Sequence, residues 1–385
     1  MRRENELDRR VGGELAHAGD ATHPGDMRMP LDRRLAPTPG WPMLMTVDRT
    51  PTTRIGLLAA VCCALVVALA GGTTSSTASP AAPPMLVWET DEFDGALVVQ
   101  EVGGSRPRLL GDGRRPRLSP DGRWVAFVGD EHTYVVATVG GRTSLVARDA
   151  DPIRWSPDSR YLATVGQGRA LAVFDMRTRR SVTIDFDATF HGVSFSPSST
   201  DIVWARQTGR TYSIERGIDI VRARVDGTGR SRLVSGGRNA APAWGRRAIA
   251  FGKIRPGRVP RFPVYELWTM SPGGDGLRRV TRTSHIPVDW SDDGRVLLTS
   301  SHHAAQSVLS SRSVLSLVEP QTRKVRVILE GDFVIPHALS RDGRSALAWS
   351  WDPKIKPYGK IVRVSSNGST RTLVRKAGEF ADWNL

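Results

Sequence analysis

Cysteine is scarce in this chain of 385 residues, which contains only Cys62 and Cys63. Two adjacent cysteines exclude a disulfide-rich scaffold and a zinc site built from thiolates, because either would need more of them. The sequence also lacks a Walker A loop, a His-Glu-x-x-His motif, an EF-hand loop and a Cys-x-x-Cys pair. No motif therefore indicates nucleotide, zinc-peptidase, calcium or thiol redox chemistry.

The composition is that of a folded protein with a strong basic excess. Hydrophobic residues make up 39% of the chain and charged residues 24%, which is typical of one large domain or two ordinary ones. The formal net charge is +15, from 54 basic and 39 acidic residues. Because the charges in residues 1–54 are nearly balanced, the excess lies downstream and favours an anionic partner.

The beginning of the chain does not have the pattern of a folded domain. Residues 1–54 are rich in Gly, Pro, Asp and Arg without hydrophobic periodicity, which predicts a disordered segment. This segment is untranslated if the start lies at Met43 or Met45. Residues 73–84, with the sequence TTSSTASPAAPP, predict a flexible linker.

An unbroken apolar run, IGLLAAVCCALVVALA, spans residues 55–70. Two arginines precede it and Ala-Leu-Ala ends it, so residues 55–72 predict a signal peptide or, if translation begins at Met1, an uncleaved membrane anchor. The basic side is N-terminal, which places the rest of the chain outside the cytoplasm. The alternatives are a buried core helix and lipid attachment at Cys62 or Cys63.

One phrase recurs six times after the linker. It combines an apolar or aromatic residue, a turn related to Ser-Pro-Asp-Gly and an apolar strand. The copies are PRLSPDGRWVAFV (116–128), IRWSPDSRYLATV (153–165), VSFSPSSTDIVWA (193–205), PAWGRRAIAF (242–251), VDWSDDGRVLLTS (288–300) and HALSRDGRSALAWS (337–350), with a shortened seventh, FADWNL, at 380–385. Steps of 37 to 49 residues between copies are typical of four-stranded propeller blades.

The phrase predicts two strands joined by a tight turn. In Ser-Pro-Asp-Gly the Ser and Asp side chains bond nearby backbone, Pro presets φ and Gly accepts a positive φ. One apolar position ends the first strand and faces inward, at Leu118, Trp155, Phe195, Trp244, Trp290, Leu339 and Trp383. Third strands are predicted at 96–102, 133–139, 170–176, 219–225, 266–272, 314–320 and 360–366, each followed by a turn and a short fourth strand.

The two ends of the repeat region supply the parts of one blade. The first unit begins at Met85 and lacks an opening strand, whereas residues 380–385 are an opening strand without a blade. Joining them closes a ring and removes exposed sheet edges. We therefore predict an all-β, seven-bladed β-propeller over residues 85–385, with six blades as the alternative.

The phrases SPDGRWVAFV, WSPDSRYLATV and ELWTMSPGGDGLRRVT resemble the WD40-like repeats of the TolB family. The resemblance covers essentially all of residues 85–385 and implies a periplasmic or extracellular propeller that binds proteins. The chain departs from the family pattern in having seven predicted blades rather than six. It also has no room between residues 73 and 84 for the family's extra N-terminal domain. The resemblance implies a TolB-like fold and leaves the task open.

Candidate catalytic and metal-binding residues are few. A propeller-linked hydrolase needs a Gly-x-Ser-x-Gly elbow, which the sequence lacks. Four aspartates that recur at the predicted turns are expected to cap those turns rather than bind calcium: Asp121, Asp158, Asp293 and Asp342. His191, His285 and His337 are predicted to precede opening strands, and three imidazoles near one channel mouth can bind a metal, as in propeller lyases that act on acidic sugars. The expected alternative, favoured because their offsets differ, is that they are ordinary loop or hydrogen-bonding histidines.

The long links between second and third strands are a better candidate site. These links are short in units two and three and long in units four to seven, at 206–217, 252–264, 301–312 and 351–359. They interleave basic and aromatic side chains, a combination that can bind an anionic partner, and the alternative is a solvated basic surface in an Arg-rich protein. The predicted partner-binding residues are Lys253, Arg255, Arg258, Arg261, Phe262, Trp351, Lys354, Lys356, Tyr358, Arg210 and Tyr212.

Together these patterns predict an exported or membrane-tethered propeller that acts as a non-enzymatic binding scaffold in the cell envelope. Its expected partner is an envelope protein or an anionic envelope polymer, not nucleic acid, and the protein is expected to be a monomer without a cofactor. The protein is expected to contact the membrane only through residues 55–72, if this segment is not cleaved. The alternative function is a lyase acting on acidic polysaccharide with a His-bound metal.

Overall fold

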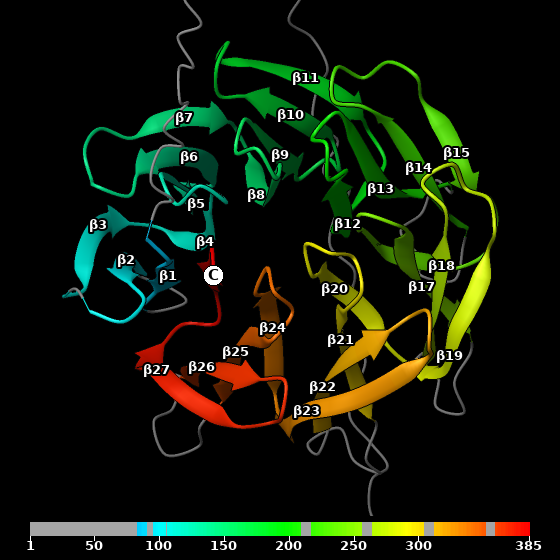
Figure 1. The fold of residues 1–385 in the computed structure, drawn as a ribbon. Coiled ribbons are helices and arrows are strands. Elements are labelled where there is room, and N and C mark those ends of the chain that lie inside the picture. Colours follow the sequence, from blue (N-terminus) through cyan, green and yellow to red (C-terminus); the bar gives the residue numbers. More distant parts are fainter. Residues whose placement is uncertain are drawn as a thin grey trace, which may run out of the picture. The chain divides into compact units, whose positions relative to one another are not determined.

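The computed structural model describes residues 83–90, 95–104, 106–208, 217–255, 264–303, 312–351 and 359–385. In these residues every regular element is a strand, and the strands form seven four-stranded antiparallel sheets arranged in a ring (Figure 1). The predicted all-β, seven-bladed propeller is therefore confirmed. No helix in this part of the chain is long and apolar enough to cross a membrane. The segments 1–54, 55–72 and nearly all of 73–84 lie outside the described residues.

Blades 2 to 7 run in chain order from an inner strand to an outer strand, whereas the inner strand of blade 1 is the last strand of the chain. Blade 1 contains β28 (Ala381–Trp383), β1 (Met85–Glu89), β2 (Ala96–Glu101) and β3 (Arg108–Asp112). Blade 2 contains β4 (Arg114–Leu118), β5 (Trp124–Gly129), β6 (His132–Ala137) and β7 (Ser144–Ala147). Blade 3 contains β8 (Ala150–Trp155), β9 (Tyr161–Gly166), β10 (Leu171–Asp175) and β11 (Arg180–Asp185). Blade 4 contains β12 (Ala188–Phe195), β13 (Asp201–Gln207), β14 (Ile218–Arg224) and β15 (Ser231–Val234). Blade 5 contains β16 (Asn239–Trp244), β17 (Ile249–Arg255), β18 (Val264–Met270) and β19 (Arg278–Ser284). Blade 6 contains β20 (Ile286–Trp290), β21 (Leu297–His303), β22 (Arg312–Glu319) and β23 (Lys324–Asp332). Blade 7 contains β24 (Val334–Leu339), β25 (Ser345–Trp351), β26 (Gly359–Ser365) and β27 (Thr370–Ala377).

The ring closes in blade 1, where the last strand of the chain pairs with the first. β28 lies antiparallel to β1, with Trp383 opposite Leu86 and Ala381 opposite Trp88. The Met85 N–H donates to Asn384 Oδ1 at 2.6 Å, which fixes the register of the joint. The predicted closure is confirmed, and it leaves no inner edge exposed in this blade.

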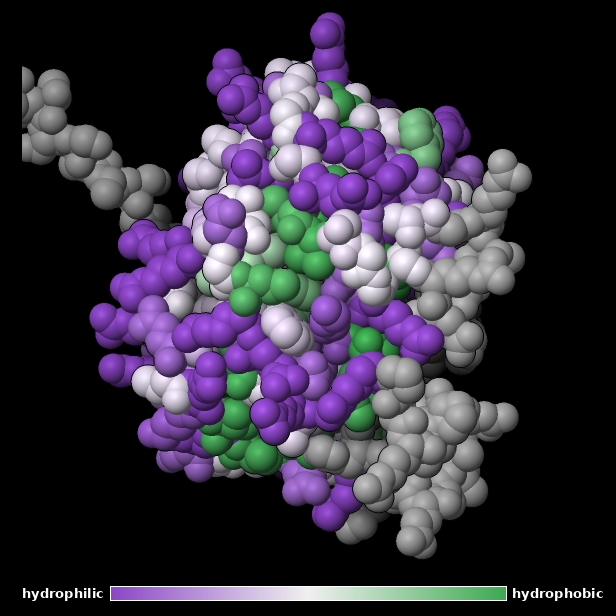
Figure 2. Space-filling model, turned by 90° about the vertical axis from the view of Figure 1, so that its right-hand side faces the viewer, coloured by the Kyte–Doolittle hydropathy of each residue, from purple (hydrophilic) through white to green (hydrophobic). Residues whose placement is uncertain are grey.

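The core lies between blades. Seven clusters of buried apolar residues fill the seven blade–blade interfaces. The second strand of a blade is covered on both faces, so it reads as a continuous apolar run, as in Val125–Val128, which are all at most 5% exposed. The outer surface around blades 4 and 5 is largely hydrophilic, with apolar residues in limited patches (Figure 2).

The turns after the inner strands share one hydrogen-bond pattern. Ser119 Oγ donates to Asp121 Oδ1 at 2.6 Å, and the Arg123 N–H donates to the same oxygen at 3.1 Å. The Ser–Asp bond recurs at Ser156, Ser291 and Ser340. Gly122 ends the first turn with φ of 71°. The aspartates act as turn caps, as predicted, and each holds the turn of its own blade.

Candidate functional site

The links into the inner strands and the links from second to third strands lie at one face of the ring, here called the link face. Backbone hydrogen bonds join the two kinds of link. The Gln207 N–H donates to the Asp187 carbonyl at 2.9 Å, and the Trp351 N–H donates to the Phe333 carbonyl at 3.1 Å. The capped Ser–Asp turns lie at the opposite face, here called the turn face.

Blades differ in the length of the second-to-third-strand link. The link is two residues in blade 2 (130–131) and residues 167–170 in blade 3. In blades 4 to 7 the strands leave residues 208–217, 256–263, 304–311 and 352–358 between them. The long links are therefore confirmed, but their predicted limits were too wide. Residues 252–255 extend β17 and Trp351 ends β25, because β pairing continues past the apolar run.

Most of the predicted partner-binding residues lie outside the described part of the chain. These are Arg210, Tyr212, Arg258, Arg261, Phe262, Lys354, Lys356 and Tyr358. Lys253, Arg255 and Trp351 are described, and each occupies a strand end at the link face, where a long link begins.

The two basic residues that end β17 contact their own blade. Lys253 Nζ lies 5.2 Å from the centre of the Trp268 ring, a cation–π contact. Arg255 Nη1 lies 3.4 Å from Glu266 Oε1, which Arg279 Nη1 also approaches at 3.4 Å. Sequence reasoning missed Glu266 because it lies on the neighbouring strand. Both cations nonetheless keep exposed surface, and 53% of the Arg255 side chain is accessible.

Aromatic side chains lie at the same face in blade 7. The rings of Phe333 and Trp351 meet edge to face with centroids 6.0 Å apart. Phe333 has φ of 50°, unusual for an aromatic residue, and is half exposed. Phe333 also lines the central channel, so this pair belongs to the channel rim.

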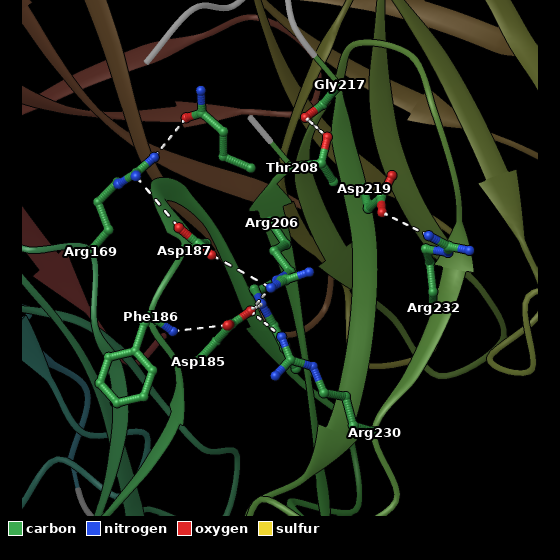
Figure 3. A network of polar contacts seen from close by, with 12 residues as sticks. Arg169, Asp185, Phe186, Asp187, Arg206, Thr208, Gly217, Asp219, Arg230 and Arg232 are labelled. Carbon is green, nitrogen blue, oxygen red and sulfur yellow. Dashed lines mark hydrogen bonds and ion pairs between the residues drawn. The ribbon is translucent and has the colours of Figure 1, made fainter. Parts of the chain in front are cut away.

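A polar network crosses from blade 3 to blade 4 near the link face (Figure 3). Asp185, which is 4% exposed, accepts hydrogen bonds from Trp204 Nε1 at 2.7 Å and the Phe186 N–H at 2.8 Å. Arg230 Nη2 lies 2.6 Å from the same carboxylate, and Arg206 Nε lies 3.1 Å from it. Burial alone raises the pKa of Asp185, but the hydrogen bonds from Arg230, Trp204 and Phe186 outweigh it and hold the pKa below its usual value.

The three candidate histidines do not form a site in the described residues. His285 is buried, and its two ring nitrogens lie 3.0 Å from Thr299 Oγ1 and 3.1 Å from Thr283 Oγ1. His337 lies on β24 and faces the channel, whereas the side chain of His191 lies outside the description. Across the described ranges no group of three His, Cys, Asp or Glu side chains is placed to hold a metal ion.

The inner strands of the blades enclose a central channel with a cavity of about 1180 Å³. Towards the link face its wall is apolar and aromatic, with Phe333, Ile335, Ile286 and Phe380. Deeper in the channel the wall is charged. This charge was visible in the repeats, since the residue before the strand-ending apolar position is Arg117, Arg154, Asp289 and Asp382 in four of them.

The charged channel residues join blades that are distant in sequence. Arg154 Nη1 of blade 3 lies 3.3 Å from Asp289 Oδ1 of blade 6, and Arg154 Nη2 donates to the Val288 carbonyl at 3.1 Å. Asp382 Oδ2 accepts the Leu118 N–H of the next blade at 3.0 Å. These contacts fix the blades around the channel in a way that no single repeat encodes.

Burial perturbs several channel groups. It raises the pKa of Asp382 to about 6, against the opposing charge of Arg117. Burial likewise lowers the pKa of His337 to about 3, with a contribution from Arg117, although the imidazole bonds the Glu379 backbone. His337 is therefore neutral near pH 7, and its Nε2 has no hydrogen-bond partner.

Comparison with solved structures places this chain among β-propellers. An oligogalacturonate lyase in complex with manganese is 15% identical, with a TM-score of 0.53 over 76% of this chain and 85% of that one. TolB from Acinetobacter baumannii is 15% identical, with a TM-score of 0.50 over 78% of this chain and 83% of that one. The β-propeller domain of the Trilobed protease from Pyrococcus furiosus is 14% identical, with a TM-score of 0.55 over 76% and 94%.

At these identities the likeness shows the fold alone, and it supports a TolB-like propeller. No protein family matches the sequence, and no curated protein sequence matches it either. The solved neighbours include both enzymes and TolB, so they do not decide whether this chain catalyses a reaction.

Proposed function

We propose that this protein is an exported or membrane-tethered propeller that binds an acidic partner at its link face. The observation that carries the proposal is the position of the strand ends that four long links connect, in blades 4 to 7, on one face of a rigid ring. Binding segments are commonly long loops held by a rigid scaffold. Blade 1, with residues 90–95 between β1 and β2, and blades 2 and 3, with shorter links, complete the ring.

The charge of the link-face residues favours an anionic partner. Lys253 and Arg255 lie at the end of β17, just before the 256–263 link, and the sequence of this link adds Arg258 and Arg261 without an acidic residue. An envelope protein with an acidic patch or an anionic envelope polymer fits this chemistry. Since the cations keep solvent access, screening over about 8 Å at physiological salt should weaken capture.

Charge removal at one face and then at the other tests the proposal. The triple variant Arg255→Gln, Arg258→Gln, Arg261→Gln should lose most cross-linked capture of envelope components, with a melting temperature close to wild type. The matched control removes three exposed arginines from the turn face, Arg177→Gln, Arg179→Gln and Arg180→Gln, and should capture normally. Equal capture by both triple variants would refute the link-face assignment.

The lyase alternative has its own test, because the described histidines do not assemble a metal site. Purified protein is incubated with polygalacturonate, with and without Mn²⁺, and the unsaturated product is followed by its ultraviolet absorbance. We expect no absorbance increase. Turnover that depends on His337 would replace the binding proposal with a catalytic one.

A further inference from the structure

We propose that the charged depth of the central channel is a binding site for a small organic acid that carries a hydroxyl or amine donor beside its carboxylate. The site consists of Arg117 on β4 and His337 on β24, which face the same cavity from blades 2 and 7. It is separate from the link-face surface and does not depend on the macromolecular partner proposed above.

Arg117 supplies the cation for such a ligand. Its Nε is buried without a hydrogen-bond partner, and within the described ranges Asp382 and Asp151 act on it through their charge, without a hydrogen bond or ion pair. The nearby Asp382 directs its two oxygens to the N–H groups of Leu118 and Trp383, at 3.0 and 2.9 Å. Arg154, in contrast, is already paired with Asp289. Arg341, which also lines the cavity, lies at the turn face and donates to the Pro120 carbonyl at 2.7 Å. Arg117 is therefore the guanidinium deep in the channel that is placed to bind an incoming carboxylate.

His337 supplies the acceptor. One ring nitrogen donates a hydrogen bond to the Glu379 backbone carbonyl and therefore carries the proton. The other nitrogen, Nε2, keeps its lone pair. Nε2 is buried and has no partner in the structure. A buried polar atom without a partner is unfavourable by itself, and a ligand hydroxyl or amine N–H would satisfy it.

The remaining wall defines the rest of the ligand. Ile335 lies on β24, two residues before His337. Phe380 immediately precedes β28, which carries Asp382. Both line the cavity on the side of the link face. The cavity of about 1180 Å³ exceeds the needs of a single small acid, so an apolar or ring-shaped body fits beside the polar end.

Mandelate is a direct probe because it combines a carboxylate, an adjacent hydroxyl and an apolar ring. Binding is measured by isothermal titration against phenylacetate, which lacks the hydroxyl, and mandelamide, which lacks the charge. We expect mandelate to bind with a dissociation constant on the order of 1 mM. Phenylacetate should bind about fivefold more weakly and mandelamide about tenfold more weakly.

Variants assign each part of the ligand. Arg117→Gln should remove the preference for mandelate over mandelamide, and His337→Asn, which keeps a donor toward Glu379, should remove the preference over phenylacetate. Arg295→Gln, at the turn face, should change neither preference. Absence of mandelate binding, or an unchanged preference in Arg117→Gln, would overturn the site.

A spectroscopic measurement on the wild-type protein covers the case in which Arg117→Gln does not fold. The ¹⁵N resonance of His337 Nε2 should move when mandelate is added and should move much less with phenylacetate. If the ¹⁵N chemical shift of His337 Nε2 did not change with either acid, neither ligand would reach His337, and the proposal would fail.

Discussion

The two faces of the ring differ in how closely they follow one repeat. At the turn face, four blades cap their turns with the same Ser–Asp hydrogen bond, between 2.5 and 2.7 Å long. At the link face, blade 2 spans its second-to-third link with two residues, while blade 4 uses residues 208–217. The repeated face supports the scaffold, and the face that varies from blade to blade is where specific interactions with a partner can develop.

The largest change in stability is expected at the polar network near the link face, where three side chains share the buried carboxylate of Asp185. Asp185→Ala should lower the free energy of unfolding by about 3 kcal/mol, because Arg230, Arg206 and Trp204 lose their common acceptor. Denaturant titration measures the loss. Asp187→Asn is the matched control, since that partly exposed residue pairs only at 3.4 to 3.5 Å and should cost less than about 1 kcal/mol. Equal losses would contradict the importance of burial.

The channel predicts two opposite pH effects. His337 stays neutral in the folded protein to a pKa of about 3 but titrates near 6.5 when unfolded, so acidification from pH 7 to 5 destabilises the fold by about 2 kcal/mol. Asp382 takes up a proton near pH 6 in the folded protein and near 3.8 when unfolded, so the same acidification stabilises the fold by about 1 kcal/mol.

Variants separate the two channel contributions. His337→Asn should lose less stability than wild type between pH 7 and 5, whereas Asp382→Asn should lose more. Urea midpoints at the two pH values give both numbers. If both variants changed with pH as the wild type does, neither group would titrate as the channel environment requires.

The smallest effects belong to the turn face, because its contacts are repeated. Replacing Asp121, Asp158, Asp293 or Asp342 by Ala removes one cap in one blade and should cost about 1 kcal/mol in each case. Thermal unfolding of the four variants tests the equivalence. A single aspartate with a cost several times larger than the others would show that the turns are not interchangeable.

Sequence predicted the parts of the fold that one blade repeats. The strand order, the pairing of the last strand with the first and the turn caps all follow from local pattern and periodicity. Contacts between blades were missed, since Arg154 and Asp289 are 135 residues apart and meet only when the ring closes. Likewise, Arg255 was assigned to a loop because the pairing of β17 with β18 continues past the apolar run that marked the strand, and its contact with Glu266 depends on that pairing.

The six lysines provide the most direct test of partner binding at the link face. Lys253, Lys354 and Lys356 lie at or within its long links, whereas the exposed Lys324 begins β23 at the turn face. Amine-reactive cross-linking of the protein with its captured envelope partner, followed by mass spectrometry, reports which lysines are adjacent to that partner. We predict cross-links from Lys253, Lys354 or Lys356 that disappear at high salt. Cross-links confined to Lys324 would contradict binding at the link face.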